Sequence, residues 1–425
     1  MTFNTISVVG LGYIGLPTAA MFASRKKQVI GVDVNQHVVD TINRGEIHIV
    51  EPELDIIVRA AVTAGYLKAV TATEPADAFL IAVPTPFKKK ATEIPEPDVS
   101  YIEAAARSIA KVLKKGDLVI LESTSPVGTT EQMAEWLAEA RTDLSFPQQV
   151  GDQADVNVAH CPERVMPGHV VRELVENDRV IGGMTDICSQ RAIELYKTFV
   201  SGDCGVTNAR TAEMVKLTEN SCRDVQIAFA NELSVICDEL SINVWELISL
   251  ANRHPRINIL QPGPGVGGHC IAVDPWFIVS KTPDKAKLIH TARNINDQKP
   301  EWVITQVNSA ISRYLANNPD KTSSDVSVAC YGLAFKADLD DLRESPALLI
   351  AKKLAKSHPG KLLAIEPNVE ALHNEIELNM KLVDLEVAQR DAQIHVLLVE
   401  HFQFKGMKVP ADYVVDTRGC WGYHY

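Results

Sequence analysis

The chain has 425 residues, which is too long for one ordinary hydrophobic core and indicates two or three domains. Hydrophobic residues make up 46% and charged residues 23%, as in globular proteins, and the net charge of −12 argues against nucleic acid or an anionic membrane as the main partner. The eight cysteines form no CxxC pair and no zinc spacing, so we expect no metal site and a reducing, cytoplasmic setting. No apolar run approaches the length of a membrane span.

A dinucleotide-binding pattern opens the chain. Residues 5–10 predict a strand, residues 16–25 a helix and residues 28–32 a second strand that ends in Asp33. The first connection reads GLGYIG, and its glycines are Gly10, Gly12 and Gly15. In that order they permit a tight turn, close approach of a pyrophosphate and packing of helix on strand. Asp33 should accept hydrogen bonds from ribose hydroxyls, and no arginine follows it to hold a 2′-phosphate, which favours NAD over NADP.

Polar turns follow three further predicted strands, at residues 78–83, 118–121 and 156–159. Because the carboxyl ends of such strands line the ligand crevice of a doubly wound sheet, we expect the hydroxyl groups of the first two turns to border the cofactor. These are the side chains of Thr85, Ser123 and Thr124; ordinary turn chemistry is the alternative. The third turn places an acid and a base, Glu163 and Arg164, at the same crevice.

A long helix is predicted over residues 207–241. One of its faces carries Glu213, Lys216, Asn220, Arg223 and Ile227, spaced by three and four residues. A solvated charged stripe is one interpretation; a lysine and an asparagine that serve a catalytic site are the other. A helix of this length between two α/β units also suits a homodimer interface.

The segment PGPGVGGHCIAVDP, residues 262–275, surrounds Cys270 with four glycines. Glycine lets the backbone approach a ligand closely, so this loop predicts a thiol held against a bound molecule. The commoner fate of a free cysteine is that of a small buried hydrophobic residue. The glycines, the adjacent His269 and the nearby Asp274 favour a functional thiol. His254 and Arg256 belong to a cationic cluster before the loop, which an acidic protein needs in order to bind an anionic substrate.

A second α/β unit closes the chain, with strands predicted at 326–331, 362–365, 394–399 and 413–415 and a helix at 346–357. Its first loop is not a GxGxxG, so this half should bind a nucleotide other than NAD. Lys336 and Arg343 lie at the crevice end and suit a diphosphate. The expected fold is therefore α/β, with two Rossmann-like doubly wound domains joined by a long central helix and boundaries at 1–206, 207–320 and 321–425.

In order along the chain, the motifs GLGYIG, VPTP, STSPVG, CPER, AEMVKLTEN, GPGVGGHC and GLAFKADLDDLRESP resemble the nucleotide-sugar (UDP-glucose/GDP-mannose) 6-dehydrogenase family. Pro167 stands where glucose-specific members have a second glutamate. The segment HPRINILQPGPGVGGHCIAVDPWF resembles the branch that oxidises UDP-N-acetyl-D-mannosamine for a bacterial surface polysaccharide.

The resemblance implies a four-electron oxidation of a C6 alcohol to a carboxylate, with two NAD reduced and a thiohemiacetal and thioester on Cys270. It implies that Glu163 and Asp274 move protons or activate the hydrolytic water. Lys216 and Asn220 would stabilise oxyanions, and Thr124 would hold a water. The residues expected to contact NAD are Gly10, Gly12, Tyr13, Ile14, Gly15, Asp33, Thr85, Ser123 and Thr130. Those expected to contact the UDP-sugar are Arg164, Val165, Lys216, Asn220, Arg223, His254, Arg256 (from a neighbouring subunit), Gly267, Lys336 and Arg343. Arg418 is a further candidate for phosphate.

Three alternatives stay open at this point. One is the same chemistry on UDP-glucose or UDP-N-acetylglucosamine. Another is a two-electron hydroxyacid dehydrogenase in which Cys270 is structural. The third is a non-catalytic protein that binds NAD.

Overall fold

The structure is a computed structural model that describes residues 3–88, 94–166, 168–268, 270–369, 379–409 and 413–422. Pro167 and His269 lie outside the described residues. The chain divides into two compact units, Met1–Glu219 with Trp276–Pro283, and Asn220–Pro275 with Asp284–Tyr425. The division at residues 206 and 320 stays a prediction.

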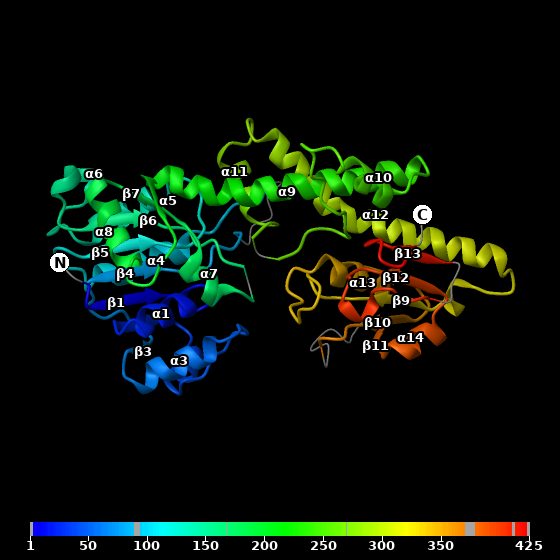
Figure 1. Cartoon of the computed structure of the whole chain (residues 1–425), viewed down its shortest axis with the longest axis horizontal. Coiled ribbons are helices and arrows are strands. Elements are labelled where there is room, and N and C mark those ends of the chain that lie inside the picture. Colours follow the sequence, from blue (N-terminus) through cyan, green and yellow to red (C-terminus); the bar gives the residue numbers. More distant parts are fainter. Residues whose placement is uncertain are drawn as a thin grey trace. The chain divides into compact units, whose positions relative to one another are not determined.

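The first unit contains an eight-stranded sheet in the order β3-β2-β1-β4-β5-β6-β7-β8 (Figure 1). Its strands are β1 (Thr5–Val9), β2 (Gln28–Val32), β3 (Leu67–Val70), β4 (Ala78–Ile81), β5 (Leu118–Leu121), β6 (Asn157–His160), β7 (Arg179–Gly183) and β8 (Cys204–Asn208). All neighbours are parallel except β6 and β7, which pair antiparallel. The first six strands have the order of a dinucleotide-binding fold.

Helices cover both faces of this sheet because successive strand residues point to opposite sides. In β4, Ala78 and Leu80 join one core cluster, while Phe79 and Ile81 join another. The first cluster includes α1 (Gly15–Ser24), α3 (Leu54–Thr63), α7 (Val170–Glu176) and α8 (Asp186–Tyr196), and the second includes α4 (Ser100–Ala110) and α5 (Thr129–Ala140). The short helices α2 (Gln36–Asn43) and α6 (Pro147–Val150) also belong to the unit.

The long helix α9 runs from Ala209 to Glu239. Its residues up to Glu219 belong to the first unit and the remainder to the second. The predicted start at residue 207 is wrong by two residues, because Thr207 and Asn208 are the last two residues of strand β8 and pair with Gly182 and Gly183 of β7. The next helices are α10 (Val244–Ala251), α11 (Asp274–Lys281) and α12 (Lys287–Asn317).

The second unit contains a five-stranded parallel sheet in the order β11-β10-β9-β12-β13 (Figure 1). Its strands are β9 (Val328–Tyr331), β10 (Leu362–Ile365), β11 (Met380–Leu382), β12 (Ile394–Leu397) and β13 (Val414–Asp416). One core cluster unites the sheet with α12 and α13 (Pro346–Ser357), and another includes α14 (Leu385–Asp391). The predicted fold class, two Rossmann-type sheets and a long central helix, is confirmed. No helix in the described ranges is both long and apolar enough to cross a membrane.

Candidate active site

The GLGYIG turn has the backbone geometry that the motif predicts. Gly10 lies in the left-handed region at φ 93°, and a Cβ there would be 2.7 Å from the carbonyl oxygen of Ala82. A Cβ on Gly15 would be 1.7 Å from the carbonyl oxygen of Gly10, so helix α1 packs directly on the turn. No atom lies within 4 Å of the position of a Cβ on Gly12, which leaves that backbone open to a ligand.

The residues around this turn fit NAD. Helix α1 begins after Ile14 without a side-chain cap and has no acidic residue in its first turn, so no side chain of the helix competes with a pyrophosphate at its N-terminus. At the end of β2, Asp33 accepts hydrogen bonds from the backbone N–H groups of Leu11 (3.0 Å) and Asn35 (2.9 Å). These bonds orient the carboxylate at the place where the ribose hydroxyls of a dinucleotide bind. The neighbouring Tyr13 is exposed.

Several hydroxyl groups predicted to border NAD donate hydrogen bonds within the protein. Thr85 Oγ1 donates to the carbonyl of Thr124 (2.7 Å), and Ser123 Oγ donates to the carbonyl of Val83 (2.7 Å). The turn chemistry considered as the alternative is therefore present for both residues. Their oxygen lone pairs can still accept from a ligand, so the cofactor contacts stay predictions.

Glu213 of α9 caps helix α5 at its N-terminus. Its carboxylate accepts from the backbone N–H groups of Gly128 (2.6 Å) and Thr130 (2.7 Å) and from Thr130 Oγ1 (2.6 Å). Glu213 is buried, and burial raises its pKa despite these bonds. Lys216 on the same helix face is also buried. A solvated stripe is therefore the wrong interpretation for these two residues, although it suits the exposed Arg223.

Glu163 lies in a buried network of charged and hydrogen-bonding groups. One carboxylate oxygen accepts from Arg179 Nη1 (2.8 Å), and the other accepts from the backbone N–H of Arg164 (2.7 Å). The Arg179 guanidinium lies 4.8 Å from the ring centroid of Tyr196, whose hydroxyl donates to Glu122 (2.6 Å). Burial, opposed by Arg179, raises the pKa of Glu122 to about 7. Sequence reasoning found Glu163 but missed its three buried neighbours.

Two expected substrate residues follow Glu163. The Arg164 guanidinium pairs with the Glu219 carboxylate (2.6 Å) and donates to the carbonyl of Asp178 (3.2 Å). Val165 is partly buried against the core of the first unit. Arg164 is therefore held by the residue that precedes β7 and by Glu219 of α9.

The glycine loop presents Cys270 at an exposed position, so the interpretation of Cys270 as a buried hydrophobic residue is wrong. The backbone N–H of Asp274 donates to the carbonyl of Cys270 (2.9 Å), which forms a turn beside the thiol. Asn220 Nδ2 donates to the buried carboxylate of Asp274 (2.5 Å). A Cβ on Gly267 would be 2.6 Å from the carbonyl oxygen of Glu344, so only glycine fits there. The structure thus brings together two predicted catalytic residues, Asn220 and Asp274, at the end of the loop.

The predicted anion-binding residues of the second unit lie in three separate segments of the chain. Arg343 forms two parallel hydrogen bonds with Asp341 and is half-exposed. Arg418 donates to the carbonyl of Pro262 (3.1 Å) and to Glu400 (2.5 Å), so its guanidinium already holds the chain. Lys336 belongs to the same loop as the backbone N–H groups of Leu333 and Ala334, which both donate to Glu366. His254 and Arg256 are exposed.

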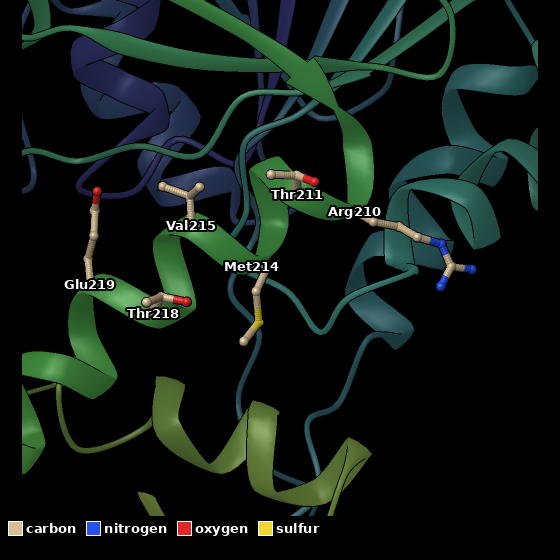
Figure 2. A pocket seen from close by; sticks show the side chains of 6 residues that line it. All are labelled: Arg210, Thr211, Met214, Val215, Thr218 and Glu219. Carbon is tan, nitrogen blue, oxygen red and sulfur yellow. The ribbon is translucent and has the colours of Figure 1, made fainter. Parts of the chain in front are cut away.

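Figure 2 shows an open pocket on α9, lined by Arg210, Thr211, Met214, Val215, Thr218 and Glu219. These positions lie on the helix face opposite Glu213, Lys216 and Asn220. Arg210 points away toward α5, where it pairs with Glu131 (2.6 Å). None of the predicted site residues lines this pocket. In the described part of the chain, no three His, Cys, Asp or Glu side chains gather in a metal-binding cluster.

The UDP-glucose/GDP-mannose dehydrogenase family matches the chain in three consecutive parts. Its NAD binding domain matches residues 4–200, its central domain residues 210–298 and its UDP binding domain residues 329–423. The chain belongs to this family. It is an NAD-dependent dehydrogenase, which excludes a non-catalytic NAD-binding protein and the separate class of hydroxyacid dehydrogenases.

Individual relatives are similar to this chain over nearly its whole length. A UDP-N-acetyl-D-mannosamine dehydrogenase of Yersinia pestis is 65% identical over 99% of this chain and 100% of its own length. An NDP-N-acetyl-D-galactosaminuronic acid dehydrogenase of Ralstonia solanacearum is 61% identical over 99% of this chain and 96% of its own. The solved UDP-N-acetyl-D-mannosamine dehydrogenase of Pyrococcus horikoshii is 38% identical with a TM-score of 0.85, covering 98% of this chain and 96% of that one.

Proposed function

We propose that this dehydrogenase oxidises the C6 alcohol of UDP-N-acetyl-D-mannosamine to the carboxylate, through a thioester on Cys270, in the cytoplasm and for a bacterial surface polysaccharide. The observation that carries the mechanism is the exposed Cys270 in a glycine loop that ends at the Asn220–Asp274 pair. The relative at 65% identity that bears the name of this substrate supports the choice of sugar.

NAD, when bound, accepts one hydride in each of two oxidations. In the first, the C6 alcohol loses a proton and a hydride and becomes an aldehyde. Lys216, which is buried, is the group proposed to accept that proton as a neutral amine, and the ammonium that results donates a hydrogen bond to the C6 oxygen.

The Cys270 thiolate then adds to the aldehyde carbon, and the new C–S bond gives a thiohemiacetal oxyanion. Asn220 already donates one amide proton to Asp274, so its second amide proton is the one proposed to stabilise this oxyanion. Loss of the second hydride leaves a thioester. Water attacks the thioester with proton transfer to Asp274 or Glu163, the C–S bond breaks, and the carboxylate and the thiol are released.

We further propose a homodimer formed through α9. Phe229 and Ile236 are 51% and 45% exposed, and their spacing places them with Leu233 in one stripe along the helix. Leu240, which is 60% exposed, directly follows the last residue of the helix. Large exposed apolar patches usually mark an interface. Replacing Leu240 by Glu should convert dimers into monomers in analytical ultracentrifugation, and an unchanged sedimentation coefficient would contradict this interface.

The function is tested by counting NADH per sugar consumed. We expect two NADH and the highest kcat/KM with UDP-N-acetyl-D-mannosamine, compared with UDP-glucose, UDP-N-acetylglucosamine and UDP-N-acetylgalactosamine. One NADH per sugar would refute the four-electron mechanism, and a higher kcat/KM with another sugar would refute the substrate. Cys270→Ser should release one burst of NADH and then stall as an oxygen ester, which mass spectrometry would locate on the peptide that contains residue 270.

A further inference from the structure

Arg293 of α12 is a fully buried charged side chain in the second unit. It forms an ion pair with Asp224 of α9, which is also buried, and a second pair with Asp297 (2.6 Å), which is half-exposed. Burial raises the pKa of Asp224 to about 6 despite the neighbouring guanidinium. Because this value is still below 8, the carboxylate is ionised at pH 8. Two helices that only needed to pack together would be served as well by apolar side chains, because a buried ion pair adds little net stability.

The same guanidinium also reaches the cysteine loop. Arg293 Nη1 donates to the carbonyl of Ile271 (3.4 Å), the residue that directly follows Cys270. The carbonyl of Cys270 itself accepts from the backbone N–H of Asp274 (2.9 Å). The backbone carbonyl groups of Cys270 and Ile271 therefore both accept hydrogen bonds, from Asp274 and Arg293 respectively.

A second bond ties the beginning of the loop to the same network. The backbone N–H of Gly263 donates to Asn231 of α9 (2.9 Å), and Asn231 donates to Asn296 of α12 (2.9 Å). Asn296 in turn donates to the Asp224 carboxylate (2.7 Å). We call the four buried residues Asp224, Asn231, Arg293 and Asn296 the loop anchor. Because positions 220, 224 and 231 share one face of α9, the anchor continues the line begun by the Asn220–Asp274 pair.

We propose that the loop anchor holds the backbone of Cys270 in the geometry that thiol addition requires, with Arg293 as the positioning residue. The proposal rests on the proposed role of Cys270 and extends it. Arg293 touches neither substrate nor cofactor in this assignment; it acts through the carbonyl of Ile271. An arginine is needed because its planar fork serves Asp224, Ile271 and Asp297 from fixed directions, whereas a lysine is a single point charge.

The test is Arg293→Lys, which keeps a positive charge beside Asp224 but lacks the fork. Rapid-quench experiments at pH 8 with UDP-N-acetyl-D-mannosamine and NAD would separate formation of the aldehyde from formation of the acid. We expect the first step to stay within about 3-fold of wild type and the thiol-dependent second step to slow by about 10- to 100-fold, since small misplacements of a reacting group cost on that order. Aldehyde trapped with hydroxylamine should then accumulate.

The matched control is Asp297→Asn, which removes only the negative charge of the half-exposed partner, keeps an oxygen that accepts from Arg293, and should leave both steps unchanged. If wild type yields two NADH per sugar and Arg293→Lys slows both steps equally, or neither, the inference is overturned while the proposed function stands. One NADH per sugar from wild type would overturn both.

Should Arg293→Lys fail to fold, Asn231→Ala decides the matter, because it releases Gly263 and leaves the buried ion pair intact. Selective slowing of the second step would support the loop anchor. If both steps slow by the same factor, or if neither step slows, the loop anchor is refuted.

Discussion

Glu122 gives the sharpest prediction about stability, because its carboxylate is buried in the first unit without a full set of partners. One oxygen accepts from Tyr196, and the other has no hydrogen-bond partner among the described residues. Burial is the main cause that raises its pKa from 4.5 to about 7; Arg179 lowers this pKa, and the Glu163 carboxylate raises it further. We predict that Glu122→Gln stabilises the protein at pH 8.

The magnitude follows from proton linkage. Between pH 4.5 and 7 the folded protein binds the Glu122 proton more tightly than the unfolded chain does, so stability falls as the pH rises through this window. The full shift corresponds to roughly 3 kcal/mol above pH 7. A glutamine does not titrate but leaves a buried amide N–H unpaired, at a cost of about 1 kcal/mol. The variant should therefore be about 2 kcal/mol more stable than wild type at pH 8 and about equally stable at pH 5, where the titration has already cost wild type about 1 kcal/mol.

The assay must report on the first unit alone. Urea titrations at pH 5 and pH 8, with pulse hydrogen exchange of peptides from β5 and α8, give the unfolding free energy of the region that holds Glu122 and Tyr196. The difference between variant and wild type at each pH cancels the titration of all other groups. A difference of the same size and sign at both pH values would refute the assignment of a raised pKa to Glu122.

Four further outcomes are expected. Gly15→Ala should weaken NAD binding by more than about 10²-fold in calorimetry while leaving UDP binding intact, because its Cβ would overlap the carbonyl of Gly10; normal NAD affinity would contradict the turn geometry. Lys216→Ala should lower kcat by about 10²-fold, and a raised KM with normal kcat would reassign Lys216 to binding. Lys336→Ala or Arg343→Ala should raise the KM for the sugar about 10-fold without changing NAD affinity, and a selective loss of NAD binding would refute their placement at the diphosphate. With Asp33 in place, NAD should give a higher kcat/KM than NADP, and equal values would contradict its role at the ribose.

Much of the fold could be predicted because its elements carry local signals. The limits of β2, β5, β10 and α13 agree with the predicted ones to the residue, since the strands are short apolar runs between polar segments and the helix begins at a proline after a capping serine. The strand β8, with the sequence CGVTN, was not predicted because it is an edge strand with mostly exposed side chains and little apolar alternation. Edge strands are defined by the neighbour they pair with, here β7, rather than by their own composition.

The candidate site likewise contains some features that the sequence reveals and others that it does not. The residues of the glycine turns and of the Cys270 loop could be found because backbone constraints and reactive groups occur together within a few positions. Partners that lie far apart in the sequence could not be found, such as Glu213 with Thr130, separated by 83 residues, or Arg293 with Asp224, separated by 69. A single sequence shows that a charged residue exists, but not which distant group neutralises it.

The capping of α5 by Glu213 limits where domains can be recombined between relatives of this enzyme. The match to the NAD binding domain ends at residue 200, yet the first-turn amides of α5 are satisfied by a carboxylate from residue 213. A nucleotide-binding fold transplanted with a border at residue 200 would arrive with those buried amides unsatisfied. The heritable module therefore extends through the opening turns of α9, and crossovers between relatives should be tolerated after Glu219 rather than before Ala209.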